Sequence, residues 1–369
     1  MHLSRRGLLY GTAGVGAVSL AGCGVGESPN QLTGYTGIAM PTTTSDRWVV
    51  EGADLEARLK DLGYKTILEY GEDDIPTQIQ QIQAMVDKGV EFLIVGAIGN
   101  TSLGEVLGNA KDKGVTVISY DRLILDTPDV DYYASFDNYQ VGVLQAKHII
   151  KQLGLSSDTT ETYNIELFSG SLDDNNSQYF FQGGLDTLET YIYGGSVVIP
   201  SGQTEQEPTA TERWDRTIAR DRMAELLDTY YKDEPLHAVL SPYDGISRGI
   251  VEALVEADYE PGTADFPVVT GQDAELLSLK AIKNNTGQTE TVFKDTRLLA
   301  GVAVEMVKTI VDGSTPEVND RGTYDNGFKF IPSFLLPPVD VTVENYQEVV
   351  VDSGYVTEDA IDNAPPDEG

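Results

Sequence analysis

Polar and charged side chains recur in this sequence directly after its short apolar runs. They lie in the segments Ser45-Asp46-Arg47-Trp48, Asp121-Arg122, Asp173-Asp174-Asn175-Asn176, Arg213-Trp214-Asp215, Tyr243-Asp244-Gly245, Gln272-Asp273 and Lys294. A carboxylate or carboxamide pairs with neighbouring hydroxyls, and a guanidinium supplies a fork of donors. Both tryptophans, Trp48 and Trp214, fall in these segments and offer flat apolar faces. The set suits a ligand with many hydroxyls on an apolar ring, such as a sugar.

Each segment taken alone also has a plainer explanation. An Asp-Arg pair after a strand is often a solvated turn, and a tryptophan often packs in a core or between lobes. Asp173 to Asn176 could cap the next helix, Tyr243-Asp244-Gly245 could be a turn, and Lys294 could be a surface cation. The recurrence of such groups at strand ends along the whole chain favours a common site.

The elements that would position these groups alternate between β-branched apolar runs and amphipathic stretches. Strands are expected at Tyr35–Met40, Tyr64–Tyr70, Val90–Val95, Val115–Ser119, Ile165–Phe168, Ala238–Leu240 and Val268–Val269. Between the first of them, Leu55, Leu59 and Leu62 recur at helical spacing, and Gly63 and Gly89 follow as helix-ending glycines do. This rhythm predicts an α/β fold of two doubly wound parallel-sheet lobes, whose ligands bind beyond the carboxyl ends of the strands.

Charge and motifs exclude several functions. The 25 Lys plus Arg against 59 Asp plus Glu give a formal charge of −34, which repels nucleic acid. The histidines His2, His148 and His237 suggest no Ser-His-Asp arrangement, and no phosphate-binding glycine motif follows a strand. A single cysteine excludes a thiolate metal cluster. We therefore expect no enzyme, cofactor or metal; a glycosidase using Asp121 and Asp174 is the enzymatic alternative.

The N-terminus has the pattern of an export signal. Arg5-Arg6 precede a short apolar run that ends in Leu20-Ala21-Gly22-Cys23, which resembles a twin-arginine signal followed by a lipoprotein cleavage box. A transmembrane anchor is the alternative, but the run is short for a bilayer span. We expect an export signal over residues 1–22, lipidation of Cys23, a tether over 23–33 and an acidic tail over 358–369.

From residue 34 to about 357 the chain resembles the type I periplasmic sugar-binding proteins of ABC importers, in particular the xylose-binding and multiple-sugar-binding receptors. The segments that carry the resemblance are Ala39-Met40-Pro41, Ser45-Asp46-Arg47-Trp48, Tyr120-Asp121-Arg122-Leu123, Asp131-Tyr132-Tyr133, Asp174-Asn175-Asn176, Gly271-Gln272-Asp273-Ala274, Phe293-Lys294-Asp295-Thr296, Tyr324-Asp325-Asn326-Gly327 and Ile331-Pro332-Ser333. Tyr243 stands where xylose receptors carry Asn, which favours the multiple-sugar pattern.

The resemblance implies the type I periplasmic binding protein fold, with two lobes joined by three hinge crossovers. It implies a first lobe of residues 34–138 plus 275–325 and a second of 139–274 plus 326–357, with crossings near Phe136–Gln140, Gln272–Glu275 and Asn326–Pro332. The ligand-binding residues that it implies are Arg47, Trp48, Asp121, Arg122 and Lys294 from the first lobe, and Asp174, Asn176, Trp214, Asp244 and Asp273 from the second lobe or the hinge.

The partners implied by the resemblance are a monosaccharide, such as xylose, galactose or glucose, and an ABC permease. With the lipid anchor at Cys23, this implies an extracytoplasmic, membrane-anchored receptor. A sugar-responsive gene regulator shares the two-lobed core but needs a basic helix-turn-helix, which an export signal replaces here. A chemosensory receptor that docks on a sensor kinase or chemoreceptor remains the alternative. In either reading, we expect Asp121 and Arg122 to bury little surface without ligand.

Overall fold

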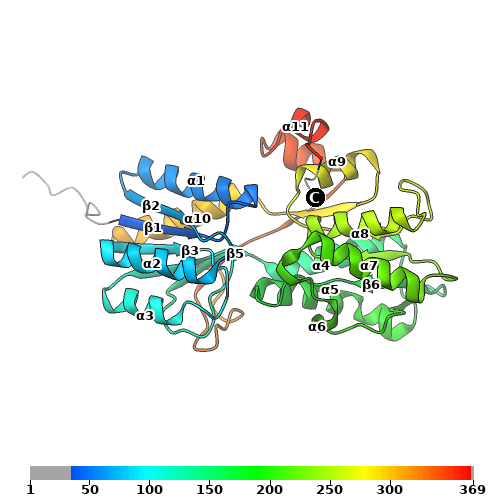
Figure 1. Cartoon of the computed structure of the whole chain (residues 1–369), viewed down its shortest axis with the longest axis horizontal. Helices are drawn as coiled ribbons and strands as arrows, with labels where there is room; N and C mark the ends of the chain where they lie inside the picture. Colours follow the sequence, from blue (N-terminus) through cyan, green and yellow to red (C-terminus); the bar gives the residue numbers. More distant parts are fainter. Residues whose placement is uncertain (1–34, 367–369) are drawn as a thin grey trace, which may run out of the picture.

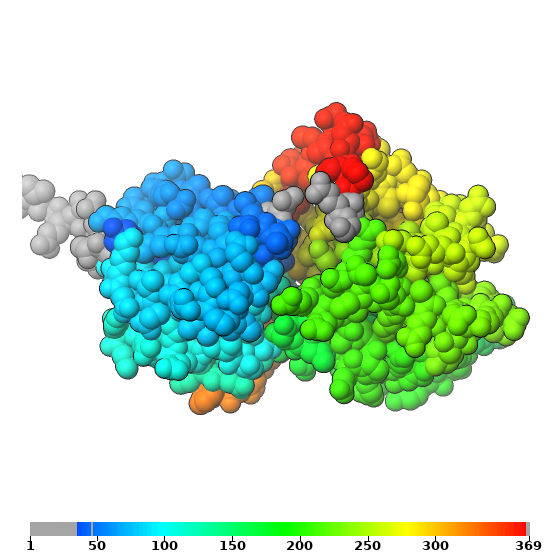
Figure 2. Space-filling model, in the orientation of Figure 1, coloured from blue at the N-terminus to red at the C-terminus, as the bar shows by residue number. Residues whose placement is uncertain are grey.

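The computed structural model describes residues 35–366, which form two α/β lobes side by side (Figure 1). The predicted export signal, the tether and Cys23 lie outside the described residues. Within the described part of the chain, no helix is both long and apolar enough to cross a membrane. The space-filling view shows the lobes as two masses that meet near the middle of the molecule (Figure 2).

The first lobe contains a parallel six-stranded sheet in the order β11-β5-β4-β3-β1-β2. Its strands are β1 (Tyr35–Met40), β2 (Lys65–Tyr70), β3 (Val90–Val95), β4 (Thr116–Tyr120), β5 (Tyr132–Phe136) and β11 (Ser333–Leu336). Helices α1 (Asp46–Asp61) and α10 (Thr296–Val311) pack on one face, and α2 (Ile75–Lys88) and α3 (Gly104–Asp112) on the other. Apolar packing on both faces explains why the central strand β3 is a nearly continuous hydrophobic run.

The second lobe repeats this plan around the parallel strands β7 (Val197–Val198), β6 (Tyr163–Leu167), β8 (Ala238–Leu240) and β9 (Val268–Val269). A bridge from Gln272 to Val292 continues the sheet into β10 (Glu290–Phe293), which pairs antiparallel with β12 (Val339–Thr342). Helices α4 (Asn138–Gln152) and α5 (Asn175–Gly194) pack on one face, and α7 (Arg216–Tyr230) and α8 (Asp244–Glu256) on the other. The remaining elements are α6 (Gln206–Thr209), η1 (Glu212–Trp214), α9 (Leu276–Asn284), η2 (Gln347–Asp352) and α11 (Glu358–Asp362).

The chain passes between the sheets three times. The first crossing, at Asp137 between β5 and α4, lies where it was expected. The other two lie at Lys294–Asp295, between β10 and α10, and at Pro337–Pro338, between β11 and β12. The expected crossings near Gln272–Glu275 and Asn326–Pro332 are wrong. The first lobe is therefore residues 35–136 plus 296–336, and the second is 137–293 plus 339–366.

Strand pairing and packing explain this correction. The segment after Gln272 stays in the second lobe because α9 shares a hydrophobic cluster with β10, β12 and α11. The segment after Asn326 stays in the first lobe because β11 pairs parallel with β5, where Ser333 lies beside Tyr133. Both β10 and β11 are four-residue strands, too short for periodicity alone to assign them to a sheet.

The expected acidic tail is also corrected in part. Residues 358–362 form helix α11, which buries Ile361 completely. Lys283 of α9 contacts Glu358 at 2.9 Å and Asp362 at 2.5 Å. The acidic side chains at the start of this segment therefore attach a helix to the second lobe.

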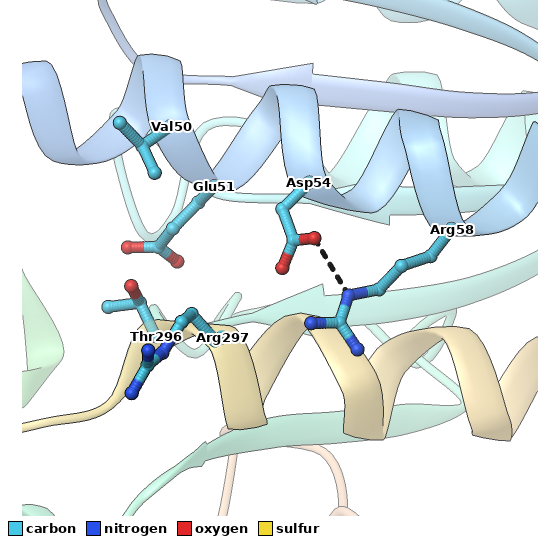
Figure 3. Close-up of a pocket in the computed structure, with 6 residues that line it drawn as sticks. All are labelled: Val50, Glu51, Asp54, Arg58, Thr296 and Arg297. Carbon is cyan, nitrogen blue, oxygen red and sulfur yellow. Dashed lines mark hydrogen bonds and ion pairs between the residues drawn. The ribbon is translucent and has the colours of Figure 1, made fainter. Parts of the chain in front are cut away.

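A cavity of about 280 Å³ lies in the first lobe between α1 and the start of α10. It is lined by Val50, Glu51, Asp54, Arg58, Thr296 and Arg297 (Figure 3). The close-up shows the Asp54–Arg58 ion pair along α1, with Glu51 facing the beginning of α10. Polar side chains from α1 and α10 therefore face one cavity in the first lobe.

Helices α4 and α5 touch through their backbones. A Cβ added at Gly142 would lie 1.9 Å from the carbonyl oxygen of Phe180, and one at Gly183 would lie 2.1 Å from that of Tyr139. No side chain other than hydrogen fits at either position, so the pair sets the distance between the two helices.

We predict that Gly183→Ala lowers the free energy of unfolding by about 1–3 kcal/mol, because the methyl group must push the two helices apart. Gly194, near the end of the same helix, has open space around its Cβ position. Gly194→Ala is the control and should leave stability unchanged or slightly raised. Urea denaturation of both variants measures the difference; equal midpoints would contradict the close contact.

Candidate functional site

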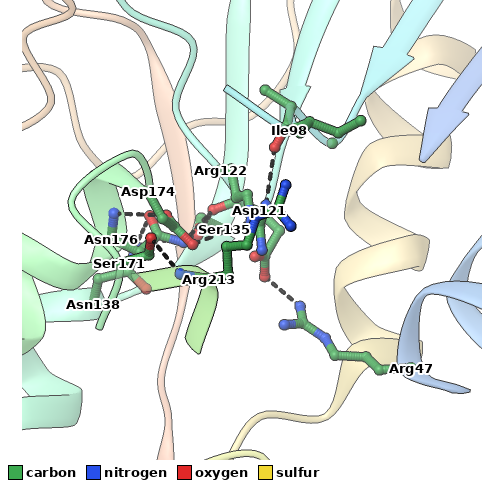
Figure 4. A network of polar contacts seen from close by, with 12 residues as sticks. Arg47, Ile98, Asp121, Arg122, Ser135, Asn138, Ser171, Asp174, Asn176 and Arg213 are labelled. Atoms are coloured by element: carbon green, nitrogen blue, oxygen red, sulfur yellow. Dashed lines mark hydrogen bonds and ion pairs between the residues drawn. The ribbon is translucent and has the colours of Figure 1, made fainter. Parts of the chain in front are cut away.

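Several polar segments found in the sequence converge where the carboxyl ends of the strands of the two lobes face each other (Figure 4). Arg47 and Trp48 begin α1 after β1, and Asp121 and Arg122 follow β4. Asp174 and Asn176 begin α5 in the second lobe. The structure therefore places side chains from both lobes around one region, as expected for residues at strand ends.

An ion pair between Arg47 and Asp121 lies at the centre of this region. Burial opposes the ionisation of Asp121, but Arg47, Lys294 and Arg122 outweigh it, so the pKa of this carboxyl is below its usual value. Arg47 also lies 4.0 Å from Asp273, whose other oxygen is 3.1 Å from the Lys294 ammonium. Cations and anions thus alternate through the region.

The main chain of Asp121 is held by several contacts, as its carboxylate is. Its φ of 62° is left-handed, a conformation that Asp adopts more readily than most residues. Its carbonyl oxygen accepts hydrogen bonds from Tyr133 Oη at 2.7 Å, Ser135 Oγ at 2.9 Å and Asn176 Nδ2 at 2.9 Å. Since Asn176 belongs to the second lobe, this carbonyl also links the lobes.

Arg122 and Asp174 form a second contact between the lobes. The Arg122 Nε lies 3.1 Å from Asp174 Oδ2, and Arg122 also donates to the carbonyl of Ala97 at 3.2 Å. Asp174 accepts from the backbone N–H of Asn176, so it caps α5 as well. Burial raises the pKa of Asp174, although Arg122 works against this shift. Asp174 therefore both caps α5 and contributes to the polar region between the lobes.

The two tryptophans have different surroundings. Trp48 is buried, with the guanidinium of Arg47 at 4.7 Å and that of Arg122 at 5.4 Å from its ring centre. Trp214 is partly exposed and lies against Gly170, edge-on to Phe180 at 6.2 Å and to Tyr243 at 5.9 Å. Trp48 thus supports the two arginines, while Trp214 retains some open ring surface.

Asp244 does not join the central contacts. It is fully buried in the second lobe, where its carboxylate accepts from Gln288 Nε2 at 2.6 Å and from the backbone N–H of Glu275 at 2.8 Å. Burial, with Glu275 adding to it, raises the pKa of Asp244 to about 8. Its visible role is to hold the loop that carries Asp273.

Sequence reasoning missed several residues that complete the region. Asn138 donates to Asn176 Oδ1 at 2.9 Å, and Tyr133 and Ser135 bind the Asp121 carbonyl. Glu51 pairs with Arg47 at 2.5 Å. Asn138 follows β5 and could have been found by the strand-end criterion, and Glu51 by its spacing of four from Arg47. Cys23 lies outside the described residues.

Residues 35–366 contain no group of three or more His, Cys, Asp or Glu side chains arranged to hold a metal ion. The acidic residues near Asp121 are instead each matched to a nearby cation.

The sequence matches the periplasmic binding protein domain family over residues 36–315. It is 49% identical to the multiple sugar-binding periplasmic receptor ChvE of Rhizobium radiobacter, over 89% of this chain and 92% of that protein. It is 50% identical to the multiple sugar-binding periplasmic protein SbpA of Azospirillum brasilense, over 87% and 89%. These relatives are receptors and binding proteins, in agreement with the prediction of a protein that is not an enzyme.

Among solved structures, the chain is similar to an ABC transporter solute binding protein from Clostridium phytofermentans with bound β-D-glucose. The TM-score is 0.84 at 40% identity, covering 89% of this chain and 99% of that one. The order of the strands, the three crossings and these matches all indicate the same fold. The chain belongs to the family of periplasmic binding proteins and has their type I fold.

Proposed function

We propose that this chain is an extracytoplasmic receptor that binds a monosaccharide between its two lobes and delivers it to an ABC permease. The observation that carries the proposal is the convergence of Arg47, Asp121, Arg122 and Asp174 from both lobes on one region. The glucose bound to the solute binding protein from Clostridium phytofermentans supports an aldose such as glucose, galactose or xylose.

The chemistry of the region suits an uncharged sugar. Arg47, Arg122 and Lys294 each contact a carboxylate, from Asp121, Asp174 or Asp273, so no anionic ligand is needed to compensate these cations. Each carboxylate can accept from a hydroxyl and each cation can donate to one, while the partly exposed ring of Trp214 offers an apolar face. A ligand with several adjacent hydroxyls on a ring can satisfy these groups together.

The two-lobed architecture supports a clamp. The residues of the region are divided between two lobes that are joined at Asp137, Lys294–Asp295 and Pro337–Pro338. A sugar that contacts both lobes favours the closed arrangement over an open one, because only the closed form makes both sets of contacts.

The N-terminal segment completes the proposal. Residues 1–22 would direct export by the twin-arginine route, and a lipid on Cys23 would anchor the protein by the tether over 23–33. The pattern Leu20-Ala21-Gly22-Cys23 supports this anchor.

We predict that Asp121→Asn and Asp174→Asn each weaken sugar binding by about 10-fold to 150-fold, the loss of a hydrogen bond to a charged group worth about 1.5–3 kcal/mol. Asn is chosen because Asp121 is buried and ion-paired, contrary to the expectation that it buries little; truncation to Ala would also destabilise the fold. Calorimetry with D-glucose, D-galactose and D-xylose measures the change.

The control is Asp173→Asn, since Asp173 precedes Asp174 but is exposed. It should bind as the parent does. If the Asp121 and Asp174 variants also bound the parent's preferred sugar within threefold, this region would not be the binding site.

We predict that a bound sugar makes the protein more compact, because it joins the two lobes. Small-angle X-ray scattering with and without saturating sugar should show a smaller radius of gyration with sugar. Asp121→Asn, measured at the same sugar concentration, should show a smaller change. Identical curves for the parent with and without a sugar that binds by calorimetry would contradict the clamp.

We predict that Cys23→Ser releases the protein from the membrane in soluble form outside the cell, with sugar binding intact, because serine has no thiol to acylate. Cell fractionation and calorimetry on the released protein measure both effects. A variant that stayed with the membrane fraction would rule out anchoring through Cys23.

A further inference from the structure

Glu51 lies behind the proposed sugar-binding residues and touches two of the segments that carry them. Its side chain, 1% exposed, is in the second turn of α1. One carboxylate oxygen accepts from Arg47 Nε at 2.5 Å, and the other accepts from Tyr120 Oη at 2.6 Å. Tyr120 directly precedes Asp121. Glu51 therefore ties the start of α1 to the end of β4.

This position determines where the Arg47 guanidinium points. Glu51 holds its Nε edge, which leaves a terminal nitrogen to pair with Asp121. The same guanidinium lies over the Trp48 ring. Without a negative charge at position 51, the charged partners left to Arg47 would be Asp121 and the more distant Asp273.

The other charged groups around Glu51 are already matched. On α1, Asp54 pairs with Arg58 at 2.8 Å, and on α10, Arg297 pairs with Asp295 at 2.7 Å. Thr296 bears a neutral hydroxyl, and Tyr355 packs against Arg297 from the second lobe. The charge of Asp121, directly after β4, opposes ionisation of Glu51. Arg47 is therefore the cation that stabilises the Glu51 carboxylate.

Glu51 also borders the cavity of about 280 Å³ between α1 and α10 (Figure 3). A cavity of this size, lined by charged side chains, is large enough to hold water, which can exchange a proton with the carboxyl group. Burial, with Asp121 adding to it and Arg47 opposing it, raises the pKa of Glu51 to about 7. Its charge therefore changes near neutral pH.

We propose that Glu51 is a positioning residue whose ionised form holds Arg47 against Asp121, so that the cleft binds an uncharged sugar less tightly as the pH falls below neutrality. The inference rests on the proposed sugar-binding function. Protonation of Glu51 removes the charge that fixes the Nε edge of Arg47, and the guanidinium becomes free to turn away from the position in which it faces the ligand.

The sign of the effect follows from linkage. If the sugar-bound form requires ionised Glu51, binding releases a proton below the pKa of the free protein, and the dissociation constant rises by up to about tenfold per pH unit. Asp121 stays ionised in this range because its pKa is lowered. The pKa of Asp244 is raised to about 8 and that of His148 is lowered to about 4, but both lie in the second lobe, where Asp244 contacts Gln288 and Glu275 and His148 contacts Thr289.

Calorimetry between pH 8 and pH 5.5, with D-glucose, D-galactose and D-xylose as probes, tests the proposal. The parent should lose about tenfold or more in affinity over this range. Glu51→Gln should bind about tenfold more weakly than the parent at pH 8 and change by less than about twofold with pH. The matched control is Asp54→Asn, one turn further along α1 and also paired with an arginine, which should keep the parent's affinity and pH profile.

A purely structural role for Glu51 would lower the melting temperature of Glu51→Gln but leave the pH profile of binding unchanged. That result, or a parent whose affinity does not vary with pH, would overturn the proposal. Should Glu51→Gln fail to fold, Glu51→Asp keeps the charge on a shorter side chain. It should bind more weakly at pH 8 and retain the dependence on pH; loss of that dependence would also overturn it.

A sugar-free measurement separates this inference from the proposed function. In a Trp214→Phe background, Trp48 is the remaining tryptophan and lies 4.7 Å from the Arg47 guanidinium. Its fluorescence should change with a midpoint near pH 7 when Glu51 is present and stay constant in Glu51→Gln. If no sugar binds the parent, the proposed function fails, whereas a flat fluorescence titration with Glu51 present overturns the role of Glu51.

Discussion

The ion pair between Arg47 and Asp121 is the interaction on which the rest of the site depends. A buried charge is costly unless a partner of opposite sign compensates it, and this pair is compensated on both sides. Glu51 binds Arg47 from behind, and Asp273 and Lys294 extend the alternation toward the second lobe. Because each charge depends on its neighbour, the side chains are oriented before any ligand arrives. Such preorganisation reduces the ordering cost of binding.

The same residue also explains how the two lobes are aligned. Asp121 presents its carboxylate to α1 and its carbonyl to β5 and α5, so three elements meet at one amino acid. Its left-handed backbone turns both groups in the required directions. Backbone strain of this kind persists where the surroundings over-determine it, and here hydrogen bonds and an ion pair both do so.

Much of this arrangement could be predicted because strand ends are local features of the sequence. The strands Tyr35–Met40, Val90–Val95 and Ala238–Leu240 lie where apolar runs placed them, and polar residues follow them. The sheet to which a short strand such as β10 or β11 belongs could not be predicted, because it depends on pairing partners far along the chain. The orientation of Asp244 could not be predicted for the same reason, because its hydrogen-bond partners Gln288 and Glu275 come from separate loops.

The crossing at Pro337–Pro338 has a consequence for how far the two sheets can extend. Neither proline carries a backbone N–H, and each restricts φ to a narrow range. Strand β11 therefore cannot lengthen into β12 by adding hydrogen bonds, although the two follow each other in the chain. The boundary between the sheets is therefore fixed at this point in the sequence. One sheet cannot gain residues from the other, so the proposed closure of the lobes would leave the registers at Ser333–Tyr133 and Phe293–Val339 unchanged.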